Sequence, residues 1–280
     1  MTSIGAPSPQ LDLLLCGNGI NFQQGDLALS TMVLVRSRGA DGKEIRTVID
    51  TGHMGMRRNI LEALTKHGVA AEEVDFVALT HAHWDHVQNL DLFPKARIVL
   101  SRAEWTSIQG EAPRDLITPA WTKHLVAGPR VTLVEPGDDI IPGIEFIDAA
   151  GHTAGCIAFA IRQGDELAIV TGDAIPWAEV ARLEQSGLVC WSVERSQETI
   201  KKLVKRADVI YPGHDRPFRL VDGEVKYLAA YDMTMFGADP STPGLKFGPP
   251  PILATIDLTD GEPRGPRWTK EELRAPAKDS

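Results

Sequence analysis

The stretch THAHWDHVQNL, residues 80–90, places three histidines and one aspartate within six residues of a chain that has only 8 histidines in 280. On an extended backbone, residues 81, 83 and 85 project to the same side, and a turn at 85–86 would bring His86 towards them. Imidazole and carboxylate groups are suitable ligands for zinc, iron, nickel or manganese. The stretch therefore predicts a metal site.

Further candidate ligands follow later in the chain. Two ions, each with about three protein ligands and an open position, need more side chains than this stretch holds. Three later motifs, AAGHTAG, VTGDA and YPGHD, place His152, Asp173 and His214 in glycine-containing turns after expected strands. Glycine permits a tight turn and a close approach to an ion. The four motifs together predict one shared site.

These motifs resemble those of the metallo-β-lactamase superfamily. THAHWDH matches the HxHxDH motif of that family, GHTAG, GD and PGHD match its later ligand motifs, and VIDTG at 48–52 matches its first motif. The resemblance covers residues 11–222. It implies an α/β fold, an αββα sandwich of two sheets between helices, with a dinuclear metal site at one edge of the sheets.

The resemblance also implies a role for each motif residue. His81, His83 and His152 would hold the first ion, and Asp85, His86 and His214 the second, with Asp173 bridging both. Asp50 would not bind an ion but would support the ligand loop through hydrogen bonds. Zinc is the expected metal for both positions, with iron or manganese as alternatives.

Local patterns predict the elements around these motifs. Residues 30–37 and 45–50 read as a hairpin with an Asp-Gly turn, and residues 48–80 as strand, helix and strand. Further strands and a helix are expected up to residue 214. We expect a catalytic domain at 1–222 and a Pro/Gly-rich extension at 223–280, which is either partly disordered or an arm that wraps the domain or a neighbouring subunit.

Composition narrows the functional class. The net charge of −9 argues against a long polyanionic partner, so nucleic acid is not the expected substrate. Three widely spaced cysteines without a CxxC motif predict reduced thiols. Since residues 1–16 lack the pattern of a signal peptide or membrane span, we expect a cytoplasmic protein without a membrane partner.

The expected function is hydrolysis by a metal-bridging hydroxide, with Asp85 carrying protons. The expected substrate is a small molecule with an activated ester, lactone, thioester or related bond. Trp84, Trp177 and His53 are candidate pocket residues, which favours an apolar or aromatic substrate. A homo-oligomer is expected, and a hetero-oligomer is left open. The alternatives are a phosphodiesterase or nuclease, a mononuclear-iron persulfide dioxygenase, and a regulatory subunit that only retains the fold.

Several sequence differences between this chain and particular members of the family limit the classes of substrate to be expected. Asp173 occupies a position at which true β-lactamases of this fold do not use aspartate. No tyrosine follows it closely in DAIPW, as one does in quorum-quenching lactonases, and the extension is a poor match to the basic helical region of glyoxalase II. Residues 195–220 resemble short family proteins, including animal members linked to RNA processing. The substrate therefore stays open at this stage.

Overall fold

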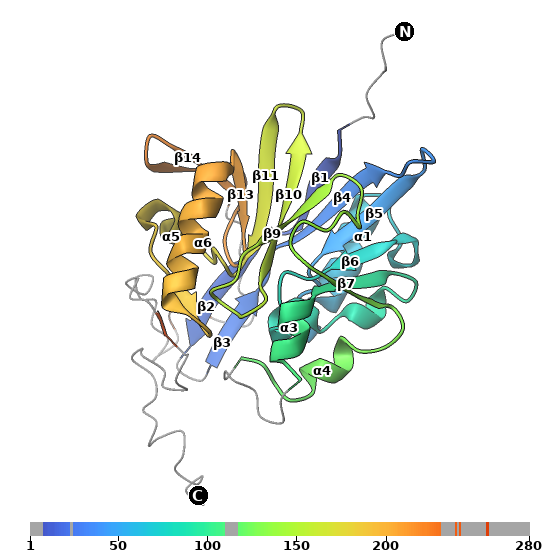
Figure 1. Ribbon diagram of the computed structural model, residues 1–280, viewed down its shortest axis with the longest axis horizontal. Coiled ribbons are helices and arrows are strands. Elements are labelled where there is room, and N and C mark those ends of the chain that lie inside the picture. The colour runs from blue at the N-terminus through green and yellow to red at the C-terminus, as the bar shows by residue number, and fades with distance from the viewer. Residues whose placement is uncertain are drawn as a thin grey trace, which may run out of the picture.

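Two six-stranded sheets form the centre of the computed structural model, which describes residues 8–22, 25–109, 117–230, 239, 241 and 256–257 (Figure 1). The first sheet contains, in spatial order, β1 (Gln10–Leu15), β4 (Met32–Arg38), β5 (Glu44–Ile49), β6 (Phe76–Ala78), β7 (Arg97–Ser101) and β8 (Val131–Val134). The second contains β15 (Glu224–Tyr227), β14 (Phe218–Val221), β13 (Val209–Pro212), β11 (Glu166–Gly172), β10 (Ile157–Gln163) and β9 (Ile144–Asp148).

The first sheet begins with the expected hairpin. β4 and β5 pair antiparallel around the Asp-Gly turn, where Gly42 has a φ of 80°. The chain then crosses through α1 (Arg57–Lys66) to β6, which pairs parallel with β5. Gly68, with a φ of 68°, follows the end of α1. The strand–helix–strand prediction for residues 48–80 is confirmed, and β7 and β8 extend the sheet in parallel.

The second sheet joins an antiparallel meander to a parallel pair. β9, β10 and β11 pair antiparallel, and β13 then pairs parallel with β11. Its crossover includes α6 (Val193–Arg206), which buries Ile200 and Leu203 on one face. Because β5 and β6 are parallel, and β11 and β13 are parallel, the carboxyl ends of each pair open at one edge of a sheet.

Helices and short strands complete the described residues. The remaining helices are α2 (Trp84–Val87), α3 (Arg102–Ser107), α4 (Thr122–Leu125) and α5 (Ala178–Leu183), with 3-10 turns at Met54–Met56, Ala71–Glu73 and Leu90–Leu92. A hairpin of β2 (Asn18–Phe22) and β3 (Gly25–Leu29) stands beside the sheets, and β12 (Leu188–Val189) pairs with β16 (Ile256–Asp257).

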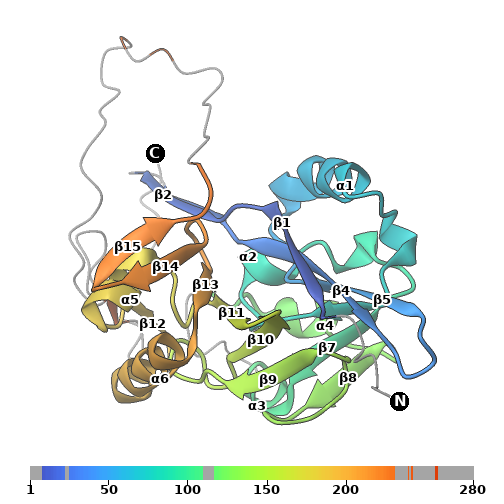
Figure 2. The ribbon, with the colours of Figure 1, turned by 90° about the horizontal axis from the view of Figure 1, so that it is seen from above.

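Along each strand the side chains point alternately to the two faces of the sheet, and this produces the layers of the sandwich. In β4, Leu34 packs into the core under α1, whereas Val33 and Val35 face the second sheet. In β10, Phe159 faces the first sheet, and Ala158 packs into the core under α5 and α6. Successive side chains of a strand point to opposite faces, so each sheet is buried on both sides. Figure 2 shows α1 and α6 on opposite outer faces, which confirms the αββα sandwich.

The region after residue 222 is described only in part. β15 lies beyond the expected boundary but pairs with β14, so the second sheet extends to Tyr227. Of the remaining extension, β16 pairs with β12. Apart from residues 228–230, 239 and 241, the rest of the extension, expected to be either partly disordered or an arm, lies outside the described residues. In the described part of the chain, no helix has the length and apolar character needed to cross a membrane.

Candidate metal centre

The candidate ligands stand at the ends of strands. Thr80 and His81 follow β6, His152 lies in the turn after β9, Asp173 directly follows β11, and His214 comes after β13. Four chain segments thereby meet at one edge of the two sheets. This arrangement agrees with the position that the sequence motifs predict for the site.

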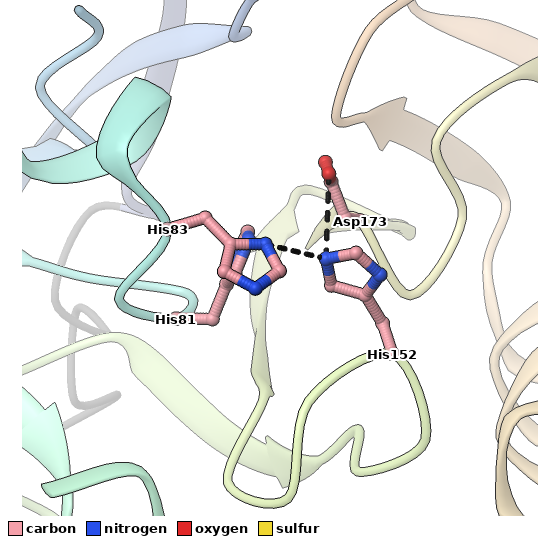
Figure 3. A group of neighbouring side chains, drawn as sticks. All are labelled: His81, His83, His152 and Asp173. Atoms are coloured by element: carbon pink, nitrogen blue, oxygen red, sulfur yellow. Dashed lines mark hydrogen bonds and ion pairs between the residues drawn. The ribbon is translucent and has the colours of Figure 1, made fainter. Parts of the chain in front are cut away.

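The candidate ligands form two adjoining buried groups. In each group the potential ligand atoms all lie within 4.8 Å of one another. Figure 3 shows His81 and His83 entering the first group from one side and His152 and Asp173 from the other. The first group contains His81, His83, His152 and Asp173, and the second contains Asp85, His86 and His214. This is the division that the family resemblance implies, although metal binding itself stays a prediction.

A helical turn separates the ligands of the THAHWDH stretch. His83 is extended, with φ −66° and ψ 152°, but α2 begins at the next residue, Trp84. The expected extended path from 81 to 85 is therefore wrong. A helical turn rotates successive side chains by about 100°, so Asp85 and His86 leave the side of His81 and His83 and enter the second group.

Hydrogen bonds fix the imidazole rings. Four of the five histidines place Nδ1 within 3.0 Å of a protein oxygen: His81 at Thr80 Oγ1, His86 at Asp50 Oδ2, His152 at the Leu188 carbonyl and His214 at the Leu29 carbonyl. This arrangement leaves Nε2 of each ring facing the site. His83 instead directs Nδ1 inward, 2.9 Å from His152 Nε2.

Buried polar atoms face the centre without hydrogen bonds. Among the described residues, Nε2 of His81, Nε2 of His86 and Oδ1 of Asp173 are buried and have no hydrogen-bond partner. Buried polar atoms are normally satisfied, and exceptions call for an explanation such as an ion. A set of imidazole and carboxylate donors fits divalent ions such as zinc.

Asp173 adjoins both groups. Its Oδ2 lies 3.5 Å from His152 Nε2 and 3.2 Å from His214 Nε2, and its Oδ1 lies 3.4 Å from His86 Nε2. Gly213 makes this position accessible, because a Cβ atom there would come within 2.0 Å of Asp173 Oδ1. Asp173 is therefore close to ring nitrogens of both groups, and its bridging role stays a prediction.

The two groups differ in charge. In the first, burial lowers the pKa of His81 well below its usual value and that of His152 to about 4, so both rings are neutral at pH 7. In the second, burial opposes the charged form of His86, but Asp85, Asp50 and Asp173 outweigh it and raise its pKa to about 10. The second group thus retains protons that an ion must displace.

Asp50 connects this site to the first sheet. It follows β5, and its Oδ1 accepts a hydrogen bond from Thr80 N at 2.8 Å. Its Oδ2 accepts one from Thr80 Oγ1 at 2.8 Å and faces His86 Nδ1 at the same distance. The expected supporting position of Asp50 agrees with these contacts.

The expected pocket residues lie in two places. The His53 and Trp84 rings have centroids 5.7 Å apart, and both side chains are half-buried. Trp177 lies beside Gly19 of β2, where a Cβ atom would come 3.3 Å from Trp177 Nε1 and 3.8 Å from His214 Cβ. Their contact with substrate stays a prediction.

The sequence motifs missed one buried acid, Glu104. It lies in α3, is 1% exposed, and accepts hydrogen bonds from Ala82 N, Thr153 Oγ1 and Gly155 N. The surrounding sequence, SRAEWTS, contains neither a histidine nor a glycine to mark it. Only the packing of α3 against the ligand loops reveals its position.

A sequence model described as the metallo-beta-lactamase superfamily matches residues 26–214, which include every candidate ligand. The chain belongs to this superfamily. Membership, together with the buried histidine and aspartate groups, confirms the expectation of a metal-dependent hydrolase at the level of the enzyme class.

The matches between this chain and its relatives in the superfamily cover about two thirds of the length of each relative. Metallo-beta-lactamase domain-containing protein 1 of Xenopus laevis is 30% identical over 187 residues, which are 63% of this chain and 69% of that protein. N-acyl homoserine lactonase of Bacillus cereus is 23% identical over 169 residues, or 56% of this chain and 62% of that protein.

A solved structure shares the fold. The AiiA protein of B. thuringiensis, a variant with N-decanoyl-L-homoserine bound at its active site, superposes with a TM-score of 0.58 at 16% identity. The superposition covers 75% of this chain and 94% of AiiA. At this level of identity, the similarity shows the fold.

Proposed function

We propose that this chain is a dinuclear metallohydrolase that cleaves an activated ester, lactone, thioester or related C–O or C–S bond in a small molecule. The observation that carries the proposal is the position of Asp173, which belongs to the first group and lies 3.4 Å from His86 Nε2 and 3.2 Å from His214 Nε2 of the second. The second group, with Asp85, His86 and His214, favours two ions over the single iron of a persulfide dioxygenase. Zinc is the proposed metal, with iron and manganese as the alternatives to measure.

The chain's residues would hold, orient and protect the reacting groups. Two divalent ions, when bound, lower the pKa of a water from ~15.7 towards about 7 and stabilise negative charge on the substrate. Neutral His81 and His152 present lone pairs without first losing a proton at pH 7. Hydrogen bonds from the outer ring nitrogens to fixed oxygens keep the ligand atoms at their places during turnover.

Asp85 is the proposed proton carrier. Burial opposes its charged form, but His86 and His214 lower its pKa. The carboxylate is therefore ionised at neutral pH and able to accept a proton from the attacking water. Its Oδ2 lies 3.2 Å from His214 Nε2, within the second group. The proposal has Asp85 then give the proton to the leaving group.

The substrate is proposed to have an apolar or aromatic part. Support comes from the half-buried Trp84, which begins the helical turn that carries Asp85 and His86 and lies against His53. Aromatic walls with a few polar groups are typical of small-molecule sites. The homoserine-lactonase relative and the ligand of AiiA favour lactones as the first class to test.

The free cysteines support a cytoplasmic location.

Metal analysis and a substrate panel test the proposal. The purified protein should contain two ions per chain and should hydrolyse members of a panel of lactones, thioesters and p-nitrophenyl esters faster than bis(p-nitrophenyl) phosphate. Trp84→Ala should raise KM for apolar substrates more than for short polar ones at unchanged metal content. One iron per chain, or activity confined to phosphodiesters, would contradict the proposal.

A further inference from the structure

The carboxylate of Glu104 is buried between two ligand loops. Its Oε1 accepts a hydrogen bond from Ala82 N at 2.9 Å. Its Oε2 accepts one from Thr153 Oγ1 at 2.7 Å and one from Gly155 N at 3.0 Å. One side chain thus joins segments that are far apart in the sequence.

These partners are neighbours of ligands from the first group alone. Ala82 lies between His81 and His83, and Thr153 directly follows His152. The carboxylate therefore connects both segments that supply histidines to the first group. Within the described residues, none of the three hydrogen bonds of the Glu104 carboxylate reaches a residue of the second group or its immediate neighbours.

A second set of contacts fixes the same loop on α3. Ser101 Oγ donates a hydrogen bond to the Gly155 carbonyl at 2.6 Å and accepts one from Glu104 N at 3.0 Å. A Cβ atom at position 155 would lie 1.9 Å from Glu104 N and 2.4 Å from its Cα. A side chain at position 155 would therefore force the loop away from Glu104, so the close approach requires glycine.

The free-energy cost of burying the Glu104 carboxyl group must be offset by hydrogen bonds. Burial raises the pKa of the Glu104 carboxyl, whereas Thr153, His83 and the backbone N–H groups of Ala82 and Gly155 oppose that rise. A buried carboxyl group is costly unless it is hydrogen-bonded. The Glu104 carboxyl group accepts three hydrogen bonds, and all three come from the ligand loops.

We propose that Glu104 is a positioning residue for the first metal ion: it holds the His81–His83 segment and the His152 segment at the spacing that one ion requires. This inference rests on the proposed metal centre. Glu104 acts through hydrogen bonds to the loops and touches neither ion nor substrate. Its removal should therefore affect the first ion selectively.

Glu104→Gln tests this role with a side chain of nearly the same shape. The amide replaces one acceptor oxygen by a donor, which must face either Ala82 N–H or Gly155 N–H. By the usual effect of residues that support metal ligands, the first ion should bind about 10- to 100-fold more weakly, and the second should be unchanged. Cobalt titration followed by absorbance, with a competing chelator, measures the two dissociation constants.

Reference variants assign the two ions. His152→Ala should remove the first cobalt spectrum and His214→Ala the second, so the signal lost in Glu104→Gln can be identified. Glu135→Gln is the matched control, because Glu135 is an exposed acid whose ion-pair partner, Arg102, is not a candidate ligand. It should bind both ions as the unmodified protein does.

The outcomes separate this inference from the proposed function. A protein that binds no second ion contradicts the dinuclear proposal before any variant is made. If the unmodified protein binds two ions, selective weakening of the first in Glu104→Gln supports the positioning role. Equal weakening of both, weakening of the second alone, or no change overturns it. If Glu104→Gln does not fold, Thr153→Val decides by the same criteria, with a smaller expected shift.

Discussion

Asp50 Oδ2 lies 2.8 Å from His86 Nδ1, although 36 residues separate the two in the sequence. Asp50 has a φ of 58°, an uncommon conformation for a residue other than glycine. The same oxygen accepts a hydrogen bond from Thr80 Oγ1. The carboxylate therefore links the end of β5 to the start of the ligand loop and to a ring of the second group.

Asp50→Asn should weaken the second ion selectively. Asparagine tolerates positive φ, so the backbone can stay in place, but its amide group must turn a donor towards either His86 Nδ1 or the Thr80 backbone N–H. We expect about a 10- to 100-fold loss in affinity for the second ion by metal titration. Asp91→Asn, which removes only an exposed ion pair with Arg57, should have no such effect.

Sequence could predict the ligands but not everything that orients them. His152, Asp173 and His214 each follow a strand and a glycine, and the other candidate ligands lie in one short stretch, so short motifs mark them all. Spacing alone placed Asp85 on the same side as His81 and His83, because it could not reveal the helical turn that begins at Trp84. Glu104 has no local mark, since its burial arises from the packing of residues 152–155 on α3. A local turn decides the position of Asp85, and contacts between distant segments decide that of Glu104.

Asp173→Ala should lower metal content and turnover together. Because Asp173 lies within 3.5 Å of ring nitrogens from both groups, its loss removes a ligand from each ion. We expect less than two ions per chain and a rate reduced by about two orders of magnitude or more. A variant that keeps two ions and full activity would show that the bridging assignment is wrong.

Binding of the second ion should release protons. His86, with a pKa of about 10, and His214, with a pKa raised well above its usual value, are protonated at pH 7 in the metal-free protein. For His214, burial opposes the charged form, but Asp173 and Asp85 outweigh it. An ion needs the lone pairs of these rings and must displace their protons.

Calorimetry in buffers of different ionisation enthalpy measures this release. At pH 7 we expect about two protons from the second group and none from His81 or His152. Since the pKa of His86 is raised from 6.5, its contribution to the stability of the metal-free protein is complete below pH 6.5 and is lost as the pH rises through about 10. Affinity for the second ion should increase over the same range. A proton count independent of pH would contradict these charge states.

Truncation after residue 230 tests the C-terminal extension while keeping β15 in its sheet. The cut removes β16, which pairs with β12 at Leu188 and Val189. Because the Leu188 carbonyl accepts the hydrogen bond from His152 Nδ1, loss of this pairing should weaken the first ion several-fold. Truncation after residue 257 retains β16 and is the matched control.

Light scattering of both variants tests the expected homo-oligomer. A smaller number of subunits in a truncated variant supports an oligomerisation arm. An unchanged number removes that role and leaves only the contact with β12.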